Sequence, residues 1–231
     1  VAEGSPAVGN TKIITEHDDL FSLANSYTYL NGVTVQTGAS ATAPIKRTLQ
    51  SRLDEIVNIK SFGATGDGAT DETVAIQRAI DQLFINSSTK GTEQSRVRLY
   101  IPAGLYKVSA TIYVPPYCTI YGDGVDKTKF SMTGNAPVFQ TVNSSSTPGN
   151  YADDSTSTTL NQATNINIQG ITLETTVINK ALILDSCKDS TFTDVKFKGP
   201  WTSGDAANVN SIGVEINSLN GTVESKDLQF I

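Results

Sequence analysis

The side chains best suited to chemistry in this sequence are carboxylates of its C-terminal third. Two carboxyl groups that face each other across a sugar chain can act as general acid and as base or nucleophile. Asp194 and Asp227 are the catalytic candidates, because they occupy equivalent places in two of the repeats described below and could share one face. The same pattern is typical of solvated carboxylates at the corners of a repeat, and further acidic residues lie nearby: Glu174, Asp185, Asp189, Glu215 and Glu224.

A second acidic group lies in the glycine-rich segment 63–73. Asp67, Asp71 and Glu72 lack the ligand alternation of an EF-hand calcium loop. No Lys-Ser or Lys-Thr follows the glycines, as it would in a phosphate-binding loop. We therefore predict no metal or cofactor here. Tight turns at Gly63, Gly66 and Gly68, followed by a helix capped by Thr70 or Asp71, explain the segment.

Three further residue types could have chemical roles. Trp201 is the only Trp and lies in an inserted loop, where it could stack on a sugar ring, pack between subunits or cover the edge of a repeat. Cys118 and Cys187 form no CxxC motif, so we expect free buried thiols. His17, the only His, is expected to be a polar residue at a helix terminus.

Composition and charge argue against several classes of protein. Lys plus Arg is 17 and Asp plus Glu is 23, so the net charge is −6. With no cluster of Lys and Arg, the sequence argues against nucleic acid as a partner. The sequence contains no run of about 18 apolar residues, so it predicts no membrane span. The abundant Thr, Ser, Asn and Gly are typical of turns and β-structure.

Residues 1–55 are predicted to form a small separate module. Two β-rich runs flank Asn31-Gly32, the pair that favours a type I′ turn, so residues 27–37 are predicted to form a hairpin. The module has too few large apolar residues for a core of its own. We therefore expect it to dock on another chain.

From residue 56 onward, one helix and many short strands are predicted. Apolar residues recur at helical spacing over about 71–84. Short alternating runs follow from residue 96, and the polar segment 143–164 is predicted to be a long excursion on the surface.

An internal repeat predicts how these strands stack. Three triplets share the spacing x, x+3, x+5, and alternating pairs lie between them: Ile168/Ile171/Leu173, Phe192/Val195/Phe197 and Ser225/Leu228/Phe230, with Leu182/Leu184 and Val214/Ile216. A unit of about 24 residues cannot bury its own apolar side, but stacked units can. The pattern favours a parallel β-helix over a β-sandwich, which also has short, closely spaced strands.

A stacked solenoid needs covered ends. The helix at 71–84 is amphipathic and precedes the first complete turn, so we predict that it caps the N-terminal end. The sequence stops within the strand pattern of Leu228–Ile231, and we expect more turns after residue 231.

Three ordered motifs resemble the pectate-lyase-like superfamily. They are Ile59-Lys60-Ser61-Phe62-Gly63-Ala64-Thr65-Gly66-Asp67-Gly68-Ala69-Thr70-Asp71-Glu72-Thr73, Tyr100-Ile101-Pro102-Ala103-Gly104-Leu105-Tyr106 and Thr119-Ile120-Tyr121-Gly122-Asp123-Gly124. The resemblance covers about 56–231 and implies a right-handed parallel β-helix. It makes Gly63, Gly66, Asp67, Gly68, Asp71, Gly104, Gly122 and Gly124 residues of a structural motif.

The segment Thr48-Leu49-Gln50-Ser51-Arg52-Leu53-Asp54-Glu55-Ile56, running straight into that motif, resembles bacteriophage tailspikes and tail fibres. This resemblance implies a homotrimer in the virion, extracellular after release. Residues 1–55 would attach it to a tail or baseplate protein, and the β-helix would contact host surface polysaccharide.

Three hypotheses therefore stand. The first is a structural spike or fibre that presents its β-helix for recognition or degradation of polysaccharide. The second is a polysaccharide lyase or glycoside hydrolase, phage-borne or secreted, with its active site beyond residue 231. The third is an adhesin-like module without catalysis. None requires a cofactor, a nucleic acid or insertion into a membrane.

Overall fold

The computed structural model describes residues 27–28, 46–47, 55–85, 97–152, 154–177, 179–201, 213–218 and 223–231. The chain divides into two units, Val1–Glu55 and Ile56–Ile231. In the first unit, β1 (Tyr27–Thr28) pairs antiparallel with β2 (Lys46–Arg47). The predicted Asn31-Gly32 turn and His17 lie outside the described residues.

The second unit consists of short strands and one helical segment. Its elements are β3 (Ile56–Asn58), the 3₁₀-helix η1 (Ile59–Phe62), β4 (Asp67–Asp71), α3 (Thr73–Ile80), the π-helical η2 (Asp81–Ile85), β5 (Arg98–Ile101), β6 (Gly104–Val108), β7 (Ile112–Val114), β8 (Thr119–Gly122), β9 (Thr128–Met132), β10 (Phe139–Thr141), the 3₁₀-helix η3 (Asp154–Thr156), β11 (Asn167–Thr175), β12 (Leu182–Asp185), β13 (Lys188–Lys198), β14 (Val214–Asn217) and β15 (Lys226–Phe230).

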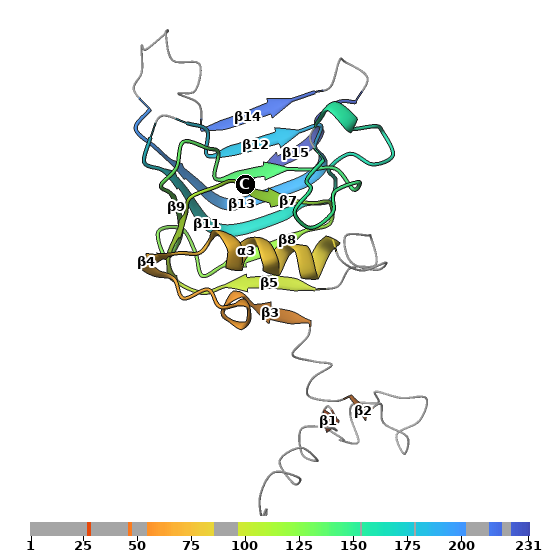
Figure 1. The fold of residues 1–231 in the computed structure, drawn as a ribbon. Coiled ribbons are helices and arrows are strands. Elements are labelled where there is room, and N and C mark those ends of the chain that lie inside the picture. Colours follow the sequence, from red (N-terminus) through yellow and green to blue (C-terminus); the bar gives the residue numbers. More distant parts are fainter. Residues whose placement is uncertain are drawn as a thin grey trace, which may run out of the picture. The chain divides into compact units, whose positions relative to one another are not determined.

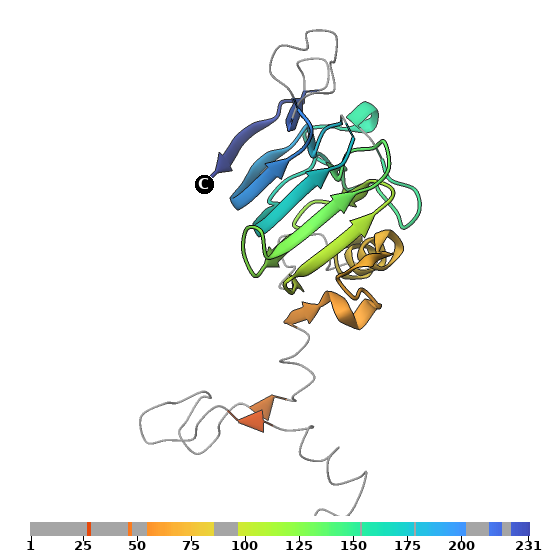
Figure 2. The ribbon, with the colours of Figure 1, turned by 90° about the vertical axis from the view of Figure 1, so that its left-hand side faces the viewer.

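Every strand of this unit pairs in parallel with the strand of the turn before or after it, and the strands form three faces (Figure 1). One face stacks β3, β5, β8, the first half of β11, the first half of β13 and β15. A second stacks β4, β6, β9 and the second halves of β11 and β13. The third stacks β7, β10, β12 and β14. Figure 2 shows the first face, and the arrangement confirms the predicted parallel β-helix.

The strand register confirms two of the predicted repeats and corrects the third. Ile168 pairs with Phe192, Ile171 with Val195 and Leu173 with Phe197, as the spacing predicts. Leu182 and Leu184 likewise pair with Val214 and Ile216. The third triplet was predicted five residues out of register, because Phe230 pairs with Phe192 rather than with Phe197. A longer connection in this turn shifts the register between the stacked strands, although the spacing within the triplet stays the same.

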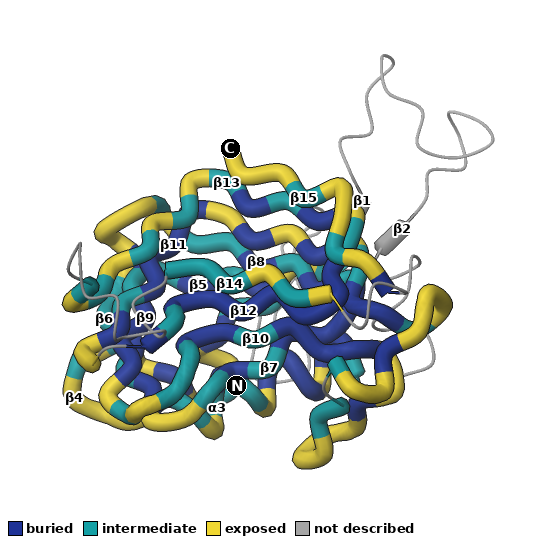
Figure 3. The backbone as a smooth tube through the Cα atoms, turned by 90° about the horizontal axis from the view of Figure 1, so that it is seen from above, coloured by how far each residue is buried: buried dark blue, intermediate teal, exposed yellow. Residues whose placement is uncertain are grey.

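The core lies between the three faces and consists of the inward residues of each turn, shown in dark blue in Figure 3. Leu99, Ile120, Ile168 and Phe192 occupy one such ladder and are at most 1% exposed. Since strands bury alternate residues, the residues between them point outward. Each turn therefore contributes apolar side chains to the core and polar ones to the surface.

A single residue in the left-handed region makes the corner inside β11. Gly170 has φ +65°, and its backbone packs on the corner of the preceding turn at Gly122. A Cβ on Gly122 would lie 2.5 Å from the carbonyl oxygen of Gly170. The glycines therefore let the backbones of neighbouring turns approach closely.

The helical segment begins two residues later than predicted, at Thr73, and continues to Ile85. The N-cap position is Glu72 rather than the predicted Thr70 or Asp71, but Asp71 accepts hydrogen bonds from the backbone N–H and the hydroxyl of Thr73, 3.0 and 2.6 Å long. The Gln77 side chain donates to the carbonyl oxygen of Tyr113 at 3.2 Å and accepts from its N–H at 2.8 Å. Gln77 thus takes the place of a neighbouring strand along β7, the end strand of its face.

The segment 143–164, predicted to be a surface excursion, is held by its own hydrogen bonds. Asn143, 1% exposed, donates to the hydroxyl groups of Thr156 and Ser157. Tyr151 stacks on Tyr113 with ring centres 4.4 Å apart and donates to Asp81 at 2.7 Å. The segment is therefore fixed to the helix and to β7.

Candidate functional site

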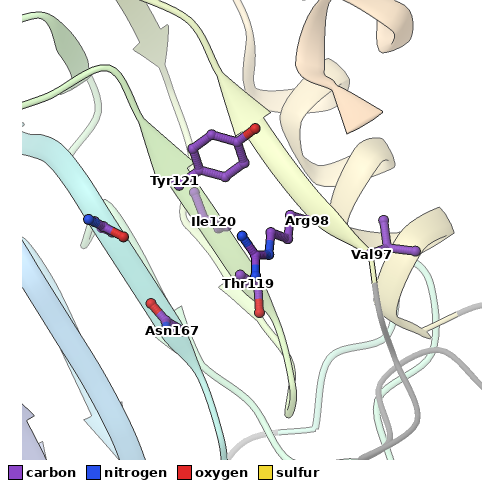
Figure 4. A pocket seen from close by; sticks show the side chains of 7 residues that line it. Val97, Arg98, Thr119, Ile120, Tyr121 and Asn167 are labelled. Atoms are coloured by element: carbon purple, nitrogen blue, oxygen red, sulfur yellow. The ribbon is translucent and has the colours of Figure 1, made fainter. Parts of the chain in front are cut away.

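A groove of about 500 Å³ crosses the outer side of the first face (Figure 4). It lies over three neighbouring parallel strands, β5, β8 and the first half of β11. Its polar and aromatic lining consists of Arg98, Thr119, Tyr121, Asn167 and Gln169, and Val97 and Ile120 complete it.

The strand register determines which lining side chains lie together. Leu99 pairs with Ile120, and Ile120 pairs with Ile168, all three in the core. The residues on either side of this ladder therefore point outward. Arg98, Thr119 and Asn167 form one outward row, and Tyr100, Tyr121 and Gln169 form the next.

The polar side chains of the groove have no partner in the part of the chain that the structure describes. Neither Arg98, Thr119, Asn167 nor Gln169 makes a side-chain hydrogen bond there, although each has donors to offer. Amides elsewhere in the β-helix are engaged. Gln162, for example, donates to Ser186 and Glu224 at 3.0 and 3.1 Å. The groove thus presents free hydrogen-bonding groups on a rigid sheet.

The aromatic part of the groove is held from one side. Tyr121 stacks on Tyr100 with ring centres 4.9 Å apart, and the Tyr100 hydroxyl donates to Asp123 at 2.7 Å. This hydroxyl, together with the N–H of Ala103, lowers the pKa of Asp123 below its ordinary value. Burial raises the pKa of Tyr121, whereas the positive charge of Arg98 acts in the opposite direction. The Tyr121 ring is therefore a fixed, neutral surface at neutral pH.

The predicted equivalence of Asp194 and Asp227 is wrong. Lys188 pairs with Lys226 and Ser190 with Leu228, which places Asp227 beside Asp189. Asp194 follows Thr193 and stacks instead on the Gly170 corner of β11. Asp189, Asp194 and Asp227 all have positive φ, the backbone of corner residues. Their catalytic role stays a prediction, without the shared face on which it rested.

Asp185, one of the additional acidic residues, is nearly buried on the third face. Its carboxylate accepts from Gln140 of the preceding turn at 2.7 Å and from Asn217 of the following turn at 2.8 Å. Burial raises its pKa, and the charges of Asp154 and Glu215 act in the same direction. Glu215 is paired with Lys180 at 2.6 Å. A buried acid of raised pKa suits proton transfer. Here, however, both carboxylate oxygens of Asp185 are engaged by hydrogen bonds that link three successive turns, which is a structural role.

Trp201 is partly buried against the core, and its indole N–H donates to the carbonyl oxygen of Asn179 at 2.9 Å. Glycines make room for the ring, since a Cβ on Gly199 would lie 2.6 Å from it. This position matches the hypothesis that Trp201 covers a turn. The sugar contact stays a prediction.

The acidic glycine-rich segment is ordered by internal hydrogen bonds. Asp67 accepts from the N–H groups of Ala69 and Thr70, both at 2.8 Å, and these bonds lower its pKa to about 2. Glu72, only 1% exposed, accepts from Thr65 twice and from Gly66 once. Among the described residues, no group of three or more His, Cys, Asp or Glu could hold a metal ion.

Glu72 and the groove are what the sequence analysis missed. Glu72 was assigned no partner of its own, because nothing in the local sequence shows that it reaches back to Thr65. The groove residues belong to alternating strands that were recognised, but only the register between turns brings Arg98, Thr119 and Asn167 together. Alignment of the three inward residues Leu99, Ile120 and Ile168 could have found it.

The remaining predictions concern thiols and membranes. Cys118 and Cys187 are buried and free, as predicted, and burial raises the pKa of both thiols, that of Cys187 to about 11. No helix within the described ranges is long and apolar enough to cross a bilayer.

Residues 56–231 match the family model described as rhamnogalacturonase A/epimerase, pectate lyase-like. Among curated proteins, a glucan 1,3-beta-glucosidase of Cochliobolus carbonum is 35% identical over 101 residues, which is 41% of this chain and 11% of that protein. The mannuronan C5-epimerase AlgE1 of Azotobacter vinelandii is 43% identical over 70 residues, 30% of this chain and 4% of that protein.

Proteins of phages are also among the similar ones. The pre-neck appendage protein of Bacillus phage B103 is 32% identical over 82 residues, 36% of this chain and 8% of that protein. The solved structure of Geobacillus virus E2 ORF18 has 29% identity and a TM-score of 0.46, over 62% of this chain and 25% of that one. The chain thus spans about a tenth or less of the curated relatives named here.

Proposed function

The chain belongs to the rhamnogalacturonase A/epimerase, pectate-lyase-like family, and from this premise we propose that it is part of a phage tail spike or fibre that binds a polysaccharide. The β-helix presents the groove over β5, β8 and β11 to the glycan. Residues 1–55 attach the protein to another tail protein, and the β-helix is a homotrimer in the virion.

One observation carries the binding function. The groove gathers hydroxyl, amide and guanidinium groups without partners among the described residues, beside the stacked ring of Tyr121. Sugar hydroxyls pair with such groups, and the apolar face of a sugar ring packs on an aromatic one. Because the sheet is rigid, little ordering entropy is lost on binding.

Two observations support the phage setting. The curated relative from Bacillus phage B103 is a pre-neck appendage protein by name. The chain also has a small unit of 55 residues before its β-helix, the arrangement expected of an attached spike. Enzymes are among the similar proteins too, but the described lining of the groove offers no carboxylate pair for glycoside cleavage.

The binding function is tested with purified chain and polysaccharide extracted from the host surface. We expect Tyr121→Ala and Asn167→Ala each to weaken binding about tenfold or more, because each removes one contact. Lys129→Ala, which changes an outward residue of the second face, is the control and should bind as the wild type does. If both groove variants bind normally, this function is excluded.

The phage setting is tested by imaging. Gold-labelled antibodies against residues 56–231 should decorate the tails of intact particles, and a virion lacking the label counts against the setting. Light scattering of the purified protein should give the mass of a trimer, whereas a stable monomer contradicts the proposed assembly.

A further inference from the structure

A second cavity, of about 450 Å³, lies where α3 and η2 meet β7 and the segment 148–151. The helix α3 lies beside β7, to which Gln77 is hydrogen-bonded (Figure 1). None of the described lining residues of this cavity belongs to the groove over β5, β8 and β11. Its aromatic and apolar wall is formed by Val74, Tyr113, Pro148 and Tyr151. The cavity is therefore a separate candidate site.

A buried carboxylate forms part of the wall of this cavity. Asp81 is 7% exposed and accepts from the side-chain amide of Gln77 at 2.9 Å and from the hydroxyl of Tyr151 at 2.7 Å. Burial and the bond to Asp81 raise the pKa of Tyr151 to about 12, so its hydroxyl stays a neutral donor at neutral pH. Within the described ranges Asp81 has no ion pair. A buried negative charge with neutral partners favours a cation beside it.

The rings next to Asp81 are suited to hold such a cation. Tyr113 and Tyr151 stack with ring centres 4.4 Å apart, and both line the cavity. The face of a tyrosine ring attracts cations, and aromatic walls of this kind bind quaternary ammonium groups. Because Val74 and Pro148 add apolar surface, methyl groups on the nitrogen fit this wall better than N–H groups, which need acceptors.

A positive charge lines the same cavity without neutralising Asp81. Arg78 is exposed, lies one helical turn before Asp81, and directs its guanidinium to the carbonyl oxygen of Phe62 at 3.5 Å. The two charged side chains form no ion pair with each other. The cavity thus offers a negative and a positive group at separate places, which suits a ligand that carries both signs of charge.

We propose that this cavity binds a small zwitterion, with a quaternary ammonium group at one end and an oxyanion at the other. The ammonium group packs on Tyr113 and Tyr151 beside Asp81. The oxyanion pairs with Arg78, whose parallel N–H donors fit a phosphate or a carboxylate. The site is independent of the proposed glycan groove, so either can fail without the other.

The test compares three probes that differ in charge. Phosphocholine carries both charges, choline carries the cation alone, and 3,3-dimethylbutyl phosphate, with carbon in place of the nitrogen, carries the anion alone. Each is titrated into the chain of residues 1–231 by calorimetry. We expect phosphocholine to bind about tenfold more tightly than either of the others, because each of them lacks one charged contact. Equal binding of all three probes would overturn the proposal.

A variant of Arg78 tests the anionic end. Arg78→Gln should weaken the binding of phosphocholine about tenfold and leave the binding of choline unchanged. Because Arg78 is exposed, this change should not alter the thermal unfolding of the chain. Lys226→Gln, which removes a positive charge from β15, is the control and should bind both probes as the wild type does. If Arg78→Gln binds phosphocholine normally, the anionic end is wrong.

The cationic end is tested at Asp81 and at the rim. Asp81→Asn should weaken the binding of phosphocholine and of choline alike. Since this change also disturbs buried hydrogen bonds, Val74 offers an independent test: it is 66% exposed, so its replacement spares the core. Val74→Lys should weaken choline binding by charge repulsion, whereas Val74→Glu, of similar length, should not. Equal binding of choline to these two variants would contradict the cationic end.

Two further probes define the ligand. Phosphoethanolamine, whose nitrogen carries hydrogens in place of methyl groups, should bind more weakly than phosphocholine, and equal binding would exclude recognition of a quaternary ammonium group. Co-sedimentation with phosphatidylcholine vesicles distinguishes a membrane headgroup from a soluble ligand, and binding of either form supports the site. Failure of both the vesicles and soluble phosphocholine to bind overturns it.

Discussion

Single buried carboxylates have larger structural roles in this protein than the exposed acidic residues that first attract interest. Glu72 and Asp185 illustrate this at the scale of residues. Glu72 fixes the loop before the helix, and Asp185 joins β10, β12 and β14. Neither role can be predicted from the sequence, since both depend on groups several residues or a whole turn away. By contrast, the turn formed by Asp67 is local and follows from its sequence.

Replacing Glu72 tests the first role. Glu72→Ala should lower the free energy of unfolding by about 1–3 kcal/mol, because the hydrogen-bond donors of Thr65 and Gly66 lose the buried carboxylate that accepts from them. Urea denaturation measures this, with Glu224→Ala, an exposed carboxylate, as the control within about 0.5 kcal/mol of wild type. Equal stability of the two variants would contradict the role.

The pH dependence of stability tests the second role. Because the pKa of Asp185 is raised in the folded state, that state binds more protons between the ordinary pKa and the raised one. This residue therefore makes the free energy of unfolding fall as pH rises through that window. Asp185→Asn should remove this component. The free energy of unfolding is measured by chemical denaturation at a series of pH values from 4 upward, with Asp194→Asn as the control. It should change less with pH in Asp185→Asn than in the control, and parallel profiles of the two variants would refute the assignment.

At the scale of elements, the helix and the corners determine how turns stack. The strands and the helix were predictable because apolar residues alternate or recur locally. The bonds of Gln77 to β7 and the contact between Gly122 and Gly170 were not, since they join segments far apart in the sequence. The same reason explains the error in the third repeat, where a longer connection changes the register.

The contact of the helix with β7 can be removed at one residue. Gln77→Ala should cost about 1–3 kcal/mol of unfolding free energy, because the N–H and carbonyl of Tyr113 lose their partners. Gln169→Ala removes the same side chain from an exposed site where it makes no hydrogen bond to any residue that the structure describes. Thermal unfolding should leave Gln169→Ala close to wild type, and a similar loss in both variants would contradict the role of Gln77.

The corner contact can be tested by adding one carbon atom. Gly122→Ala should destabilise the protein by about 1–3 kcal/mol, because its Cβ would meet the backbone of Gly170. Gly149→Ala is the control: it has φ +79° but nothing within 4 Å, so it should show only the cost of backbone strain, about 1 kcal/mol. Chemical denaturation compares the two, and a smaller effect at Gly122 would refute the close contact.

At the scale of the whole molecule, the family and the β-helix were predictable from the sequence, but the position of the groove was not. The motifs at 59–73, 100–106 and 119–124 identify the fold by their order. The groove arises from side chains at ordinary strand positions, and it exists only once β5, β8 and β11 are aligned.

The division into two units gives a prediction at this scale. Residues 56–231 expressed alone should keep the β-rich circular dichroism spectrum and a cooperative thermal transition, since every residue of the core that the structure describes belongs to this range. The chain of residues 1–231, measured in parallel, is the reference. Loss of the transition in the shorter chain would show that its fold depends on the first unit.

The variable length of the turns has a practical consequence. The register returns after 21 residues between Leu99 and Ile120, but after 48 between Ile120 and Ile168, with the inward ladder intact. Much of the extra chain lies in the polar segment 143–164, which is held by its own hydrogen bonds. Such a connection is a natural insertion point for a foreign peptide. A scaffold of this kind could display epitopes, or acquire new surface loops during evolution, while its interior stays the same.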